Sequence, residues 1–393
     1  MFQMYIYSNQ RNGEIVKMMN NKKEQLKDAI FPKIKWEGEE YDFYLGCDYH
    51  GLQNDASVRL AAQKILDLFP IKMGLSYYGY GINSTVQNLE KTAAKFFDTE
   101  TVVTYPSGYL GNLILFRVLK DEYNIIFVDE ESHYSMMDAL QISGKPFIVF
   151  KHRDFKDLKQ QMDKYLAPHD KPMIASDGIF PVTGEIAPIP QFLNILDKLG
   201  KGIICIDDSH GTGVLGDTGK GTYEYFGLKD SRLYFCGTMS KAIGSHGGII
   251  PCSNEFKQIC LKKGIVLKGA TMIPNPILAA SACAFDLLAK YPQKIKKLHE
   301  NAIYFKTKLN KIGFHNDLTP TGIAYLTLPS EEDLKELSEF LKNNKVLTNY
   351  SEPKSYTSVP DTGAIKFTIT SNHTKEQFDK VIDLLKEWIY ERF

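Results

Sequence analysis

Short apolar runs alternate with amphipathic stretches between about residues 46 and 285 of the chain. The runs are rich in Val, Ile and Phe, which favour strands. They cover residues 101–105, 124–129, 146–151, 172–176, 202–207, 233–238 and 247–252. Helical patterns lie between them, at residues 111–120, 157–166 and 190–200. This alternation predicts an α/β fold with a mostly parallel sheet covered on both faces, and ligands that gather at the carboxyl ends of its strands.

The C-terminal part has a different pattern. A long helical stretch over residues 274–312 contains Pro292, which should break it. Further patterns predict strands at 324–329 and 364–370, a polar helix at 331–344, and a last helix with Phe378, Val381, Leu385 and Trp388 on one apolar face. A single core stops growing at about 250–300 residues. We therefore expect an N-terminal segment (1–45), a large domain (46–285) and a smaller α+β domain (286–393).

Composition and charge narrow the function classes. The chain has 393 residues, and its 47 Lys and Arg balance 47 Asp and Glu, so no field attracts a nucleic acid or a membrane surface. No apolar run approaches the roughly 20 residues that span a bilayer, and the N-terminus lacks a signal-peptide core. The six cysteines form no CxxC pair, and the nine histidines form no HExxH motif. We expect a cytoplasmic protein that binds small molecules and no metal.

The first candidate site follows the strand pattern at residues 202–207. There Asp207 and His210 precede a glycine-rich turn, which places a carboxylate and an imidazole at the mouth of the sheet. The stretch GTGVLG (211–216) also matches the dinucleotide fingerprint GxGxxG. That fingerprint opens a helix after the first strand of a βαβ unit, whereas this one follows a late strand. Taken alone, the aspartate could equally cap a loop and the histidine bond to backbone.

Lys241 is the second candidate. It lies in a turn of small and hydroxyl residues, GTMSKAIGSHGG (237–248), directly after a strand pattern. A lysine removed from water has a lowered pKa and becomes a nucleophilic amine that forms a Schiff base with an aldehyde. Taken singly, such a lysine is more often a surface residue.

Two segments nearer the N-terminus add weaker signals. In TYPSGYLGNLILF (104–116) a tight Ser-Gly turn joins a strand to a helix, whose first N–H groups suit a phosphate. In VDEESHYSMMDAL (128–140), His133 lies beyond a strand, where an imidazole can stack on a flat ring. Taken singly, Ser132 as a helix cap beside a solvated His133 is the simpler interpretation.

Together these segments resemble a known family. The order SGYxxN, ESHYSxxD, SDGIFPVTGEIAPI, DDSHGTGVLG and GTMSKAIGSHGG is similar to that of the α-oxoamine synthases, which are fold-type I pyridoxal-phosphate (PLP) enzymes. The similarity runs from about Tyr44 to the C-terminus. Members of this family join an amino acid to an acyl-CoA, with loss of CoA and carbon dioxide, to give an α-aminoketone. The resemblance implies PLP as the cofactor and acyl transfer as the activity.

The same resemblance implies catalytic roles for four residues. Lys241 would attach PLP as a Schiff base and, once released, take the proton from the α-carbon of the amino acid. Asp207 would pair with the pyridine nitrogen, which makes the ring an electron sink. His210 would hydrogen-bond the phenolic oxygen of PLP and assist the acyl oxygen, and His133 would stack on the ring.

Further cofactor contacts follow from the family motifs. Gly108, Tyr109 and Thr238 would hold the phosphate, and Ser176 would line the pocket. Thr271 would reach across from a second subunit, which implies a homodimer with shared active sites.

Two departures from the family pattern concern the substrate. In GAIKFTITSNHT (363–374), Lys366 stands where the family has the arginine that binds the carboxylate of the amino acid. A lysine offers a point charge without the two-pronged fork of arginine. In GLSYYGYGINST (74–85), Ser76 and Tyr77 occupy a Gly-Ser-Arg segment of the family, with Tyr77 at the place of the arginine, and Phe43 replaces a usual asparagine. We expect Lys366, Tyr77 and Ser76 to face the substrate.

Three hypotheses follow. The first is an acyl-CoA-dependent synthase that acts on a small amino acid. The second is a fold-type I enzyme with a changed reaction, such as an aminotransferase, which needs a keto acid and no CoA. The third is a protein in which GTGVLG binds a dinucleotide, and the misplaced fingerprint disfavours it.

Overall fold

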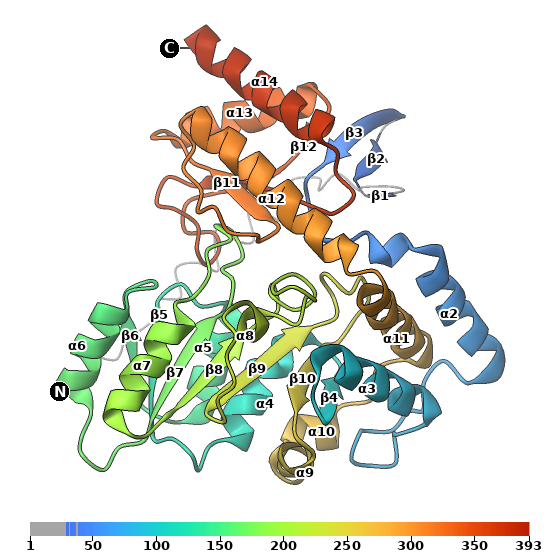
Figure 1. Ribbon diagram of the computed structural model, residues 1–393, viewed down its shortest axis with the longest axis vertical. Helices are drawn as coiled ribbons and strands as arrows, with labels where there is room; N and C mark the ends of the chain where they lie inside the picture. The colour runs from blue at the N-terminus through green and yellow to red at the C-terminus, as the bar shows by residue number, and fades with distance from the viewer. Residues whose placement is uncertain (1–28, 31, 37, 393) are drawn as a thin grey trace, which may run out of the picture.

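The computed structural model of the protein describes residues 29–30, 32–36 and 38–392 (Figure 1). Most of the predicted N-terminal segment (1–45) lies outside the described residues. Its end forms three strands, β1 (Ala29–Ile30), β2 (Lys33–Trp36) and β3 (Glu39–Phe43). Strand β3 pairs in parallel with β12 (Val346–Leu347), so the beginning of the described chain is joined to its C-terminal part.

A seven-stranded sheet forms the centre of the molecule, and its strands are the seven apolar runs of the sequence. In spatial order they are β4 (Thr101–Tyr105), β10 (Gly248–Cys252), β9 (Leu233–Thr238), β8 (Ile203–Asp207), β7 (Pro172–Asp177), β5 (Ile125–Asp129) and β6 (Phe147–Phe150). Strands β9, β8, β7, β5 and β6 pair in parallel, and β10 is antiparallel to both of its neighbours. The predicted mostly parallel sheet is confirmed.

Helices cover both faces of this sheet. Consecutive residues of a strand point to opposite faces, so each strand contributes side chains to the packing on both sides. In β7, Ile174 belongs to one apolar cluster, and Met173 and Ala175 belong to another. The first cluster includes helices α6 (Phe155–Tyr165) and α7 (Ile189–Leu199), and the second includes α4 (Gly111–Val118) and α5 (Tyr134–Ser143). Both faces are therefore apolar, which explains why these strands read as continuous hydrophobic runs.

Further helices surround the sheet. Beside β4 and β10, three of them pack together, α2 (Ala56–Leu68), α3 (Ser84–Phe97) and α11 (Asn275–Lys290). The other helices of this part are η1 (Leu52–Asn54), η2 (Gly108–Leu110), α8 (Thr222–Tyr225), α9 (Asn254–Lys263) and α10 (Ile265–Gly269). The chain breaks between α11 and the next helix at Pro292, as the sequence predicts.

The C-terminal part packs helices on a second sheet. Strands β11 (Ile323–Leu326), β14 (Ala364–Thr368) and β13 (Asn349–Ser351) form this sheet, and the helices are α12 (Gln293–Lys311), α13 (Glu331–Asn343) and α14 (Lys375–Arg392). The predicted apolar face of α14 is buried. Figure 1 shows this part above the central sheet. The division of the chain into domains at residues 45 and 285 stays a prediction.

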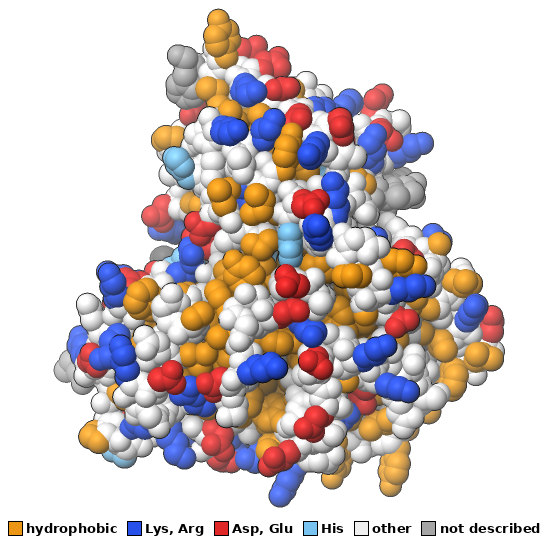
Figure 2. Space-filling model, viewed as in Figure 1, with side chains coloured by type: hydrophobic (Ala, Val, Ile, Leu, Met, Phe, Trp, Pro, Cys, Tyr) orange, Lys and Arg blue, Asp and Glu red, His pale blue; other side chains and the backbone are white. Residues whose placement is uncertain are grey.

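Large apolar side chains are exposed on α2 and the loop that follows it. This 60–82 surface consists of Leu60, Leu66, Leu68, Ile71, Met73, Leu75, Tyr78, Tyr80 and Ile82. On the face drawn in Figure 2, hydrophobic side chains lie along the right-hand edge, where Figure 1 places α2. In the part of the chain that the structure describes, no helix has the length and apolar character to cross a membrane.

Candidate functional site

A cavity of about 880 Å³ lies where the central parallel strands end, beneath the C-terminal part. Five of the residues that the sequence singled out line it together, namely His133, Asp207, His210, Lys241 and Lys366. His133 follows β5, Asp207 is the last residue of β8 and His210 follows it, Lys241 follows β9, and Lys366 comes from β14. The expected position of a ligand site at the carboxyl ends of the strands therefore agrees with the structure.

Asp207 places a carboxylate in this cavity. Its Oδ2 accepts a hydrogen bond from Nδ2 of Asn112 at 2.7 Å, and its Oδ1 accepts one from the backbone N–H of Ser209 at 3.1 Å. The residue is 5% exposed. Both oxygens accept hydrogen bonds from neutral donors, so this buried carboxylate can pair with a cation that enters the cavity, such as a protonated ring nitrogen.

The neighbouring Asp208 serves the fold instead. It faces away from the cavity, and its Oδ2 accepts a hydrogen bond from the backbone N–H of Thr222 at 2.8 Å. Burial raises the pKa of Asp208 to about 7. The segment GTGVLG (211–216) forms turns next to it and starts no helix, so it lacks the strand–helix geometry of a dinucleotide site.

Lys241 reaches the cavity from the turn after β9. Backbone hydrogen bonds close this turn, from Gly244 N to the carbonyl of Lys241 at 2.8 Å and from Ser245 N to the carbonyl of Met239 at 2.9 Å. The side chain of Lys241 lines the cavity that also holds Asp207. An amine and a carboxylate are thus available to one bound molecule.

His133 forms one wall of the cavity and caps helix α5. Its Nδ1 accepts a hydrogen bond from the backbone N–H of Ser135 at 3.2 Å, so the cap is His133 and not Ser132. Burial lowers the pKa of His133, with a further contribution from the charge of Lys241. The backbone N–H of His133 donates to Oδ1 of Asp177 at 3.2 Å, so hydrogen bonds fix both the backbone and the ring. A neutral imidazole with a fixed orientation is suited to stack on a flat ligand.

One end of the cavity can cradle an anion. Gly108 starts η2 in the turn after β4, and the first N–H groups of such a turn have no partner within it. A side-chain carbon added at Gly108 would lie 2.5 Å from Oγ1 of Thr238, so only glycine allows this close approach. The Thr238 hydroxyl donates to the carbonyl of Gly247 at 3.0 Å and accepts from Ser240 N at 3.1 Å. With Tyr109, these residues surround a space suited to a phosphate.

Lys366 brings a positive charge to the opposite wall. It is 8% exposed, and the described residues offer its amine no carboxylate within ion-pair distance. Burial, together with the nearby charge of Lys241, lowers the pKa of Lys366. A buried ammonium group without a counter-ion favours an anionic ligand in the cavity.

Four residues that the sequence singled out lie away from the cavity of their own chain. Ser176 is buried inside β7, where its hydroxyl donates to the carbonyl of Asp177 at 2.9 Å, and Asp177 lines the cavity instead. Ser76 and Thr271 form an isolated β-bridge with each other. Tyr77 is buried beside them, and its hydroxyl donates a hydrogen bond to Glu90.

Several residues that line the cavity were not predicted from the sequence, and three of them lie beside predicted site residues. Asp177 is one of them, and burial, with the charge of Asp207, raises its pKa well above the usual range. Tyr356 comes from the loop after β13, and its ring centre lies 5.7 Å from that of His133. Cys47 is the third. Asp177 lies inside the motif SDGIFPVTGEIAPI, which gave a signal, whereas no local pattern marks Tyr356 or Cys47.

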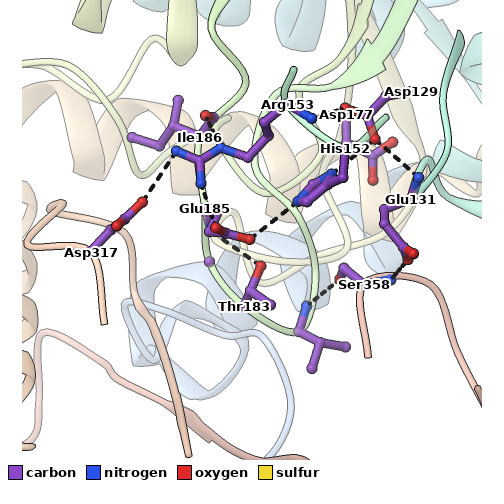
Figure 3. Close-up of polar contacts among 12 residues, drawn as sticks. Asp129, Glu131, His152, Arg153, Asp177, Thr183, Glu185, Ile186, Asp317 and Ser358 are labelled. Atoms are coloured by element: carbon purple, nitrogen blue, oxygen red, sulfur yellow. Dashed lines mark hydrogen bonds and ion pairs between the residues drawn. The ribbon is translucent and has the colours of Figure 1, made fainter. Parts of the chain in front are cut away.

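A network of charged side chains supports the cavity loop 179–187 (Figure 3). The ring of His152 lies between two carboxylates, with Nδ1 2.9 Å from Oδ1 of Asp129 and Nε2 3.2 Å from Oε2 of Glu185. Burial opposes the charge of His152, but the hydrogen bonds to Asp129 and Glu185 outweigh it and raise its pKa to about 9. Two hydrogen bonds join this region to the loop between β13 and β14. The backbone N–H of Ser358 donates to Glu131, and the Ser358 hydroxyl accepts from Val182 N.

Comparisons with known proteins agree with this geometry. Residues 47–385 match the family described as aminotransferase class I and II. The protein belongs to this family. It is 30% identical over 356 residues to 8-amino-7-oxononanoate synthase of Lysinibacillus sphaericus, with 90% of each chain covered. It is 29% identical over 341 residues to the enzyme of that name from Alkaliphilus metalliredigens, with 86% of this chain and 85% of the other covered.

Solved structures show the same fold. The protein superposes on serine palmitoyltransferase from S. paucimobilis with a TM-score of 0.85, at 21% identity, and the match covers 93% of this chain and 92% of the other. It also superposes on 8-amino-7-oxononanoate synthase from Francisella tularensis with a TM-score of 0.73, at 22% identity, covering 89% and 98%. The predicted fold-type I architecture is confirmed.

The cofactor of this family is PLP, and the cavity fits it. The cradle at Gly108 and Thr238 suits its phosphate, and the Asp207 carboxylate suits its ring nitrogen. Lys241 would supply the amine that PLP enzymes require for covalent attachment, and His133 would supply a flat wall. As a member of the family, the protein is a PLP-dependent transferase.

Proposed function

We propose that the protein joins a small amino acid to the acyl group of an acyl-CoA, with release of CoA and carbon dioxide, to give an α-aminoketone. One observation carries the proposal. The amine of Lys241, the carboxylate of Asp207 and the ammonium group of Lys366, which has no ion pair among the described residues, line a single cavity. One space can therefore hold PLP and the carboxylate of an amino acid. The similarity to proteins named 8-amino-7-oxononanoate synthase supports the same reaction class.

The residues divide the work between charge and proton transfer. When bound, PLP supplies an electron sink for the negative charge that develops at the α-carbon of the amino acid. Asp207 holds the ring nitrogen protonated by its negative charge, and the Lys241 amine accepts the α-proton. Lys366 binds the carboxylate of the amino acid and orients it, and His133 covers one face of the ring against water.

We further propose a homodimer in which each subunit completes the site of the other. The 60–82 surface exposes large apolar side chains, with Leu68 73% exposed and Tyr80 92% exposed, and surfaces of this kind mark protein interfaces. The Ser76–Thr271 bridge lies in and beside this region and outside the cavity of its own chain. Burial of the 60–82 surface against a second copy would explain why three residues predicted to touch cofactor or substrate lie together there.

We propose the cytosol as the compartment. All six cysteines are free, as expected where thiols stay reduced.

The experiment measures products from an acyl-CoA series and a panel of small amino acids with the PLP-loaded protein. We expect release of CoA that depends on the amino acid, together with labelled carbon dioxide from a carboxyl-labelled amino acid. Lys241→Ala is the control, because this variant keeps the other residues of the cavity and lacks only the amine. It should release neither CoA nor carbon dioxide. Transfer of the amino group to a keto acid without CoA release would contradict the synthase and favour an aminotransferase.

A further inference from the structure

The hydroxyl group of Tyr49 contacts the ring of His210 at the edge of the cavity. Its Oη lies 2.8 Å from Nδ1 of His210, and both side chains are buried. Tyr49 does not line the cavity, whereas His210 does. The tyrosine therefore acts on any ligand only through the histidine.

Tyr49 is rigidly placed. The backbone N–H of Ser371 donates to the carbonyl of Tyr49 at 2.8 Å. A side-chain carbon added at Gly322 would lie 2.6 Å from the Tyr49 ring, so the ring packs directly against that backbone. Both contacts come from residues next to the C-terminal sheet, and they fix the hydroxyl in front of Nδ1.

The direction of the hydrogen bond follows from the surroundings. Burial, with the charges of Lys241 and Lys366, lowers the pKa of His210 well below its usual value, so the imidazole is neutral. Burial likewise raises the pKa of Tyr49 well above its usual value, so the phenol keeps its proton. A neutral imidazole has one nitrogen that donates and one that accepts.

Only one arrangement satisfies the buried phenol well. If Nδ1 accepts, the Tyr49 proton makes a normal O–H to N hydrogen bond. If Nδ1 carried the proton, it would donate to Oη, and the phenol proton would be left with the neighbouring thiol of Cys47, which is a weak acceptor. A buried donor without a good acceptor is costly, so the first arrangement prevails.

We propose that Tyr49 is a positioning residue that donates to Nδ1 of His210 and thereby keeps the proton of the ring on Nε2. His210 then presents an N–H donor to an oxygen atom of the ligand and cannot act as a base at that atom. The tautomer concerns the protein alone, and only its use toward a bound oxygen rests on the proposed function.

The test reads the tautomer directly. The full chain is labelled with ¹⁵N-histidine, and long-range ¹H–¹⁵N spectra are recorded with and without PLP. His210→Asn identifies the signals of His210 among the nine histidines. We expect an unprotonated Nδ1 and a protonated Nε2 in the unmodified protein, and two shifts that approach each other in Tyr49→Phe as the tautomers mix. A protonated Nδ1, or an unchanged spectrum in Tyr49→Phe, would overturn the proposal.

Tyr44→Phe is a matched control. Tyr44 is buried in the same segment, but its hydroxyl has no hydrogen-bond partner among the residues that the structure describes. Its removal should change neither the tautomer nor the turnover. Both variants remove one buried hydroxyl group, so a general effect on packing should appear in both.

Kinetics of the PLP-loaded enzyme give a second readout. Tyr49→Phe should lower kcat roughly two- to tenfold, as for one hydrogen bond, with the KM for the amino acid unchanged. In a His210→Asn background the same substitution should add no further loss. An equal loss in both backgrounds would mean that Tyr49 acts elsewhere. If the enzyme released no CoA, the proposed function would fail while the spectra would still decide the tautomer.

Discussion

Arg153 and Asp317 form an ion pair between the two parts of the molecule, with Nη2 of Arg153 3.2 Å from Oδ2 of Asp317. Arg153 also pairs with Glu185 and donates from Nε to the carbonyl of Ile186 at 3.1 Å. Its backbone is left-handed, with φ of 55°, and its N–H donates to Oδ2 of Asp129 at 2.8 Å. One side chain thus ties the cavity loop 179–187 to the C-terminal part.

The two carboxylates that pair with Arg153 should differ in their effect on stability. Glu185→Gln should lower the free energy of unfolding by about 1–3 kcal/mol, because Glu185 is half-buried and serves both Arg153 and His152. Asp317→Asn should cost less than about 1 kcal/mol, since the Asp317 side chain is 51% exposed. Urea denaturation of the two variants measures both values. Equal losses would mean that the network does not act through Glu185.

His152 should make the stability depend on pH. Its pKa in the folded chain is about 9, above the ordinary value of 6.5, so its ion pairs stabilise fully below pH 6.5 and are lost as the pH rises through 9. The loss should reach roughly 3 kcal/mol at most. Urea denaturation from pH 6 to 10 should therefore show a gap between the unmodified protein and His152→Gln that closes toward high pH.

A second buried base, Lys306, makes the stability depend on pH in the opposite direction. The stability of the unmodified protein must therefore be compared with that of His152→Gln at each pH. Burial lowers the pKa of Lys306 to about 7, below its ordinary value of 10.5. The unfolded chain binds more protons than the folded chain between these values, so Lys306 makes the protein more stable as the pH rises through that range. The unmodified protein and His152→Gln both contain Lys306, so its effect cancels in the difference between their free energies of unfolding. A gap that stayed constant with pH would contradict the role given to His152.

Asp207 and Asp208 should separate chemistry from folding. Asp207→Asn should retain PLP but slow the exchange of the α-proton of the amino acid by about 10²- to 10³-fold, because a neutral amide cannot hold the ring nitrogen protonated. Asp208→Asn is the matched control, since its amide oxygen can still accept from Thr222. It should keep exchange within about tenfold. Deuterium exchange followed by NMR measures both rates, and rapid exchange in Asp207→Asn would exclude the proposed pairing.

Lys366 should set the affinity for the amino acid. Lys366→Arg adds a second charge-assisted hydrogen bond and should tighten binding by about 10- to 100-fold, provided that the fork fits the cavity. Lys366→Ala should weaken binding without a change in the spectrum of the bound cofactor, because the cofactor contacts lie on the other wall. Titration with amino acid, followed by visible absorbance, compares the three proteins. Identical affinities would show that the carboxylate binds elsewhere.

The burial of Lys366 adds a pH dependence to this binding. Its pKa is lowered in the empty cavity, and an amino-acid carboxylate would restore the charged form. Affinity should therefore fall as the pH rises through that lowered pKa. The effect should be weaker in Lys366→Arg, because a guanidinium group stays charged.

Much of the candidate site could be predicted because its residues lie at or shortly after the ends of strands. Asp207, His133 and Lys241 each lie within a few residues of a strand end, and strands of a parallel sheet end at one edge. Local rules were less reliable for side-chain direction. Ser176 and Asp177 are neighbours, and only their placement at the end of β7 decided which of them lines the cavity. The bridge of Ser76 with Thr271 spans a distance in sequence that no local pattern covers.

By itself, the sequence determined the central sheet, since every apolar run between residues 101 and 252 became one of its strands. It also determined which side chains sit at the strand ends, because both features depend on local hydrophobic pattern and on residue order. Only the tertiary structure decided the partners of those side chains. The contact of Tyr49 with His210 joins residues 161 positions apart, and the pair of Arg153 with Asp317 joins residues 164 positions apart. Such contacts depend on how the C-terminal part packs over the sheet, and that packing is the sum of many weak contacts with no local signature.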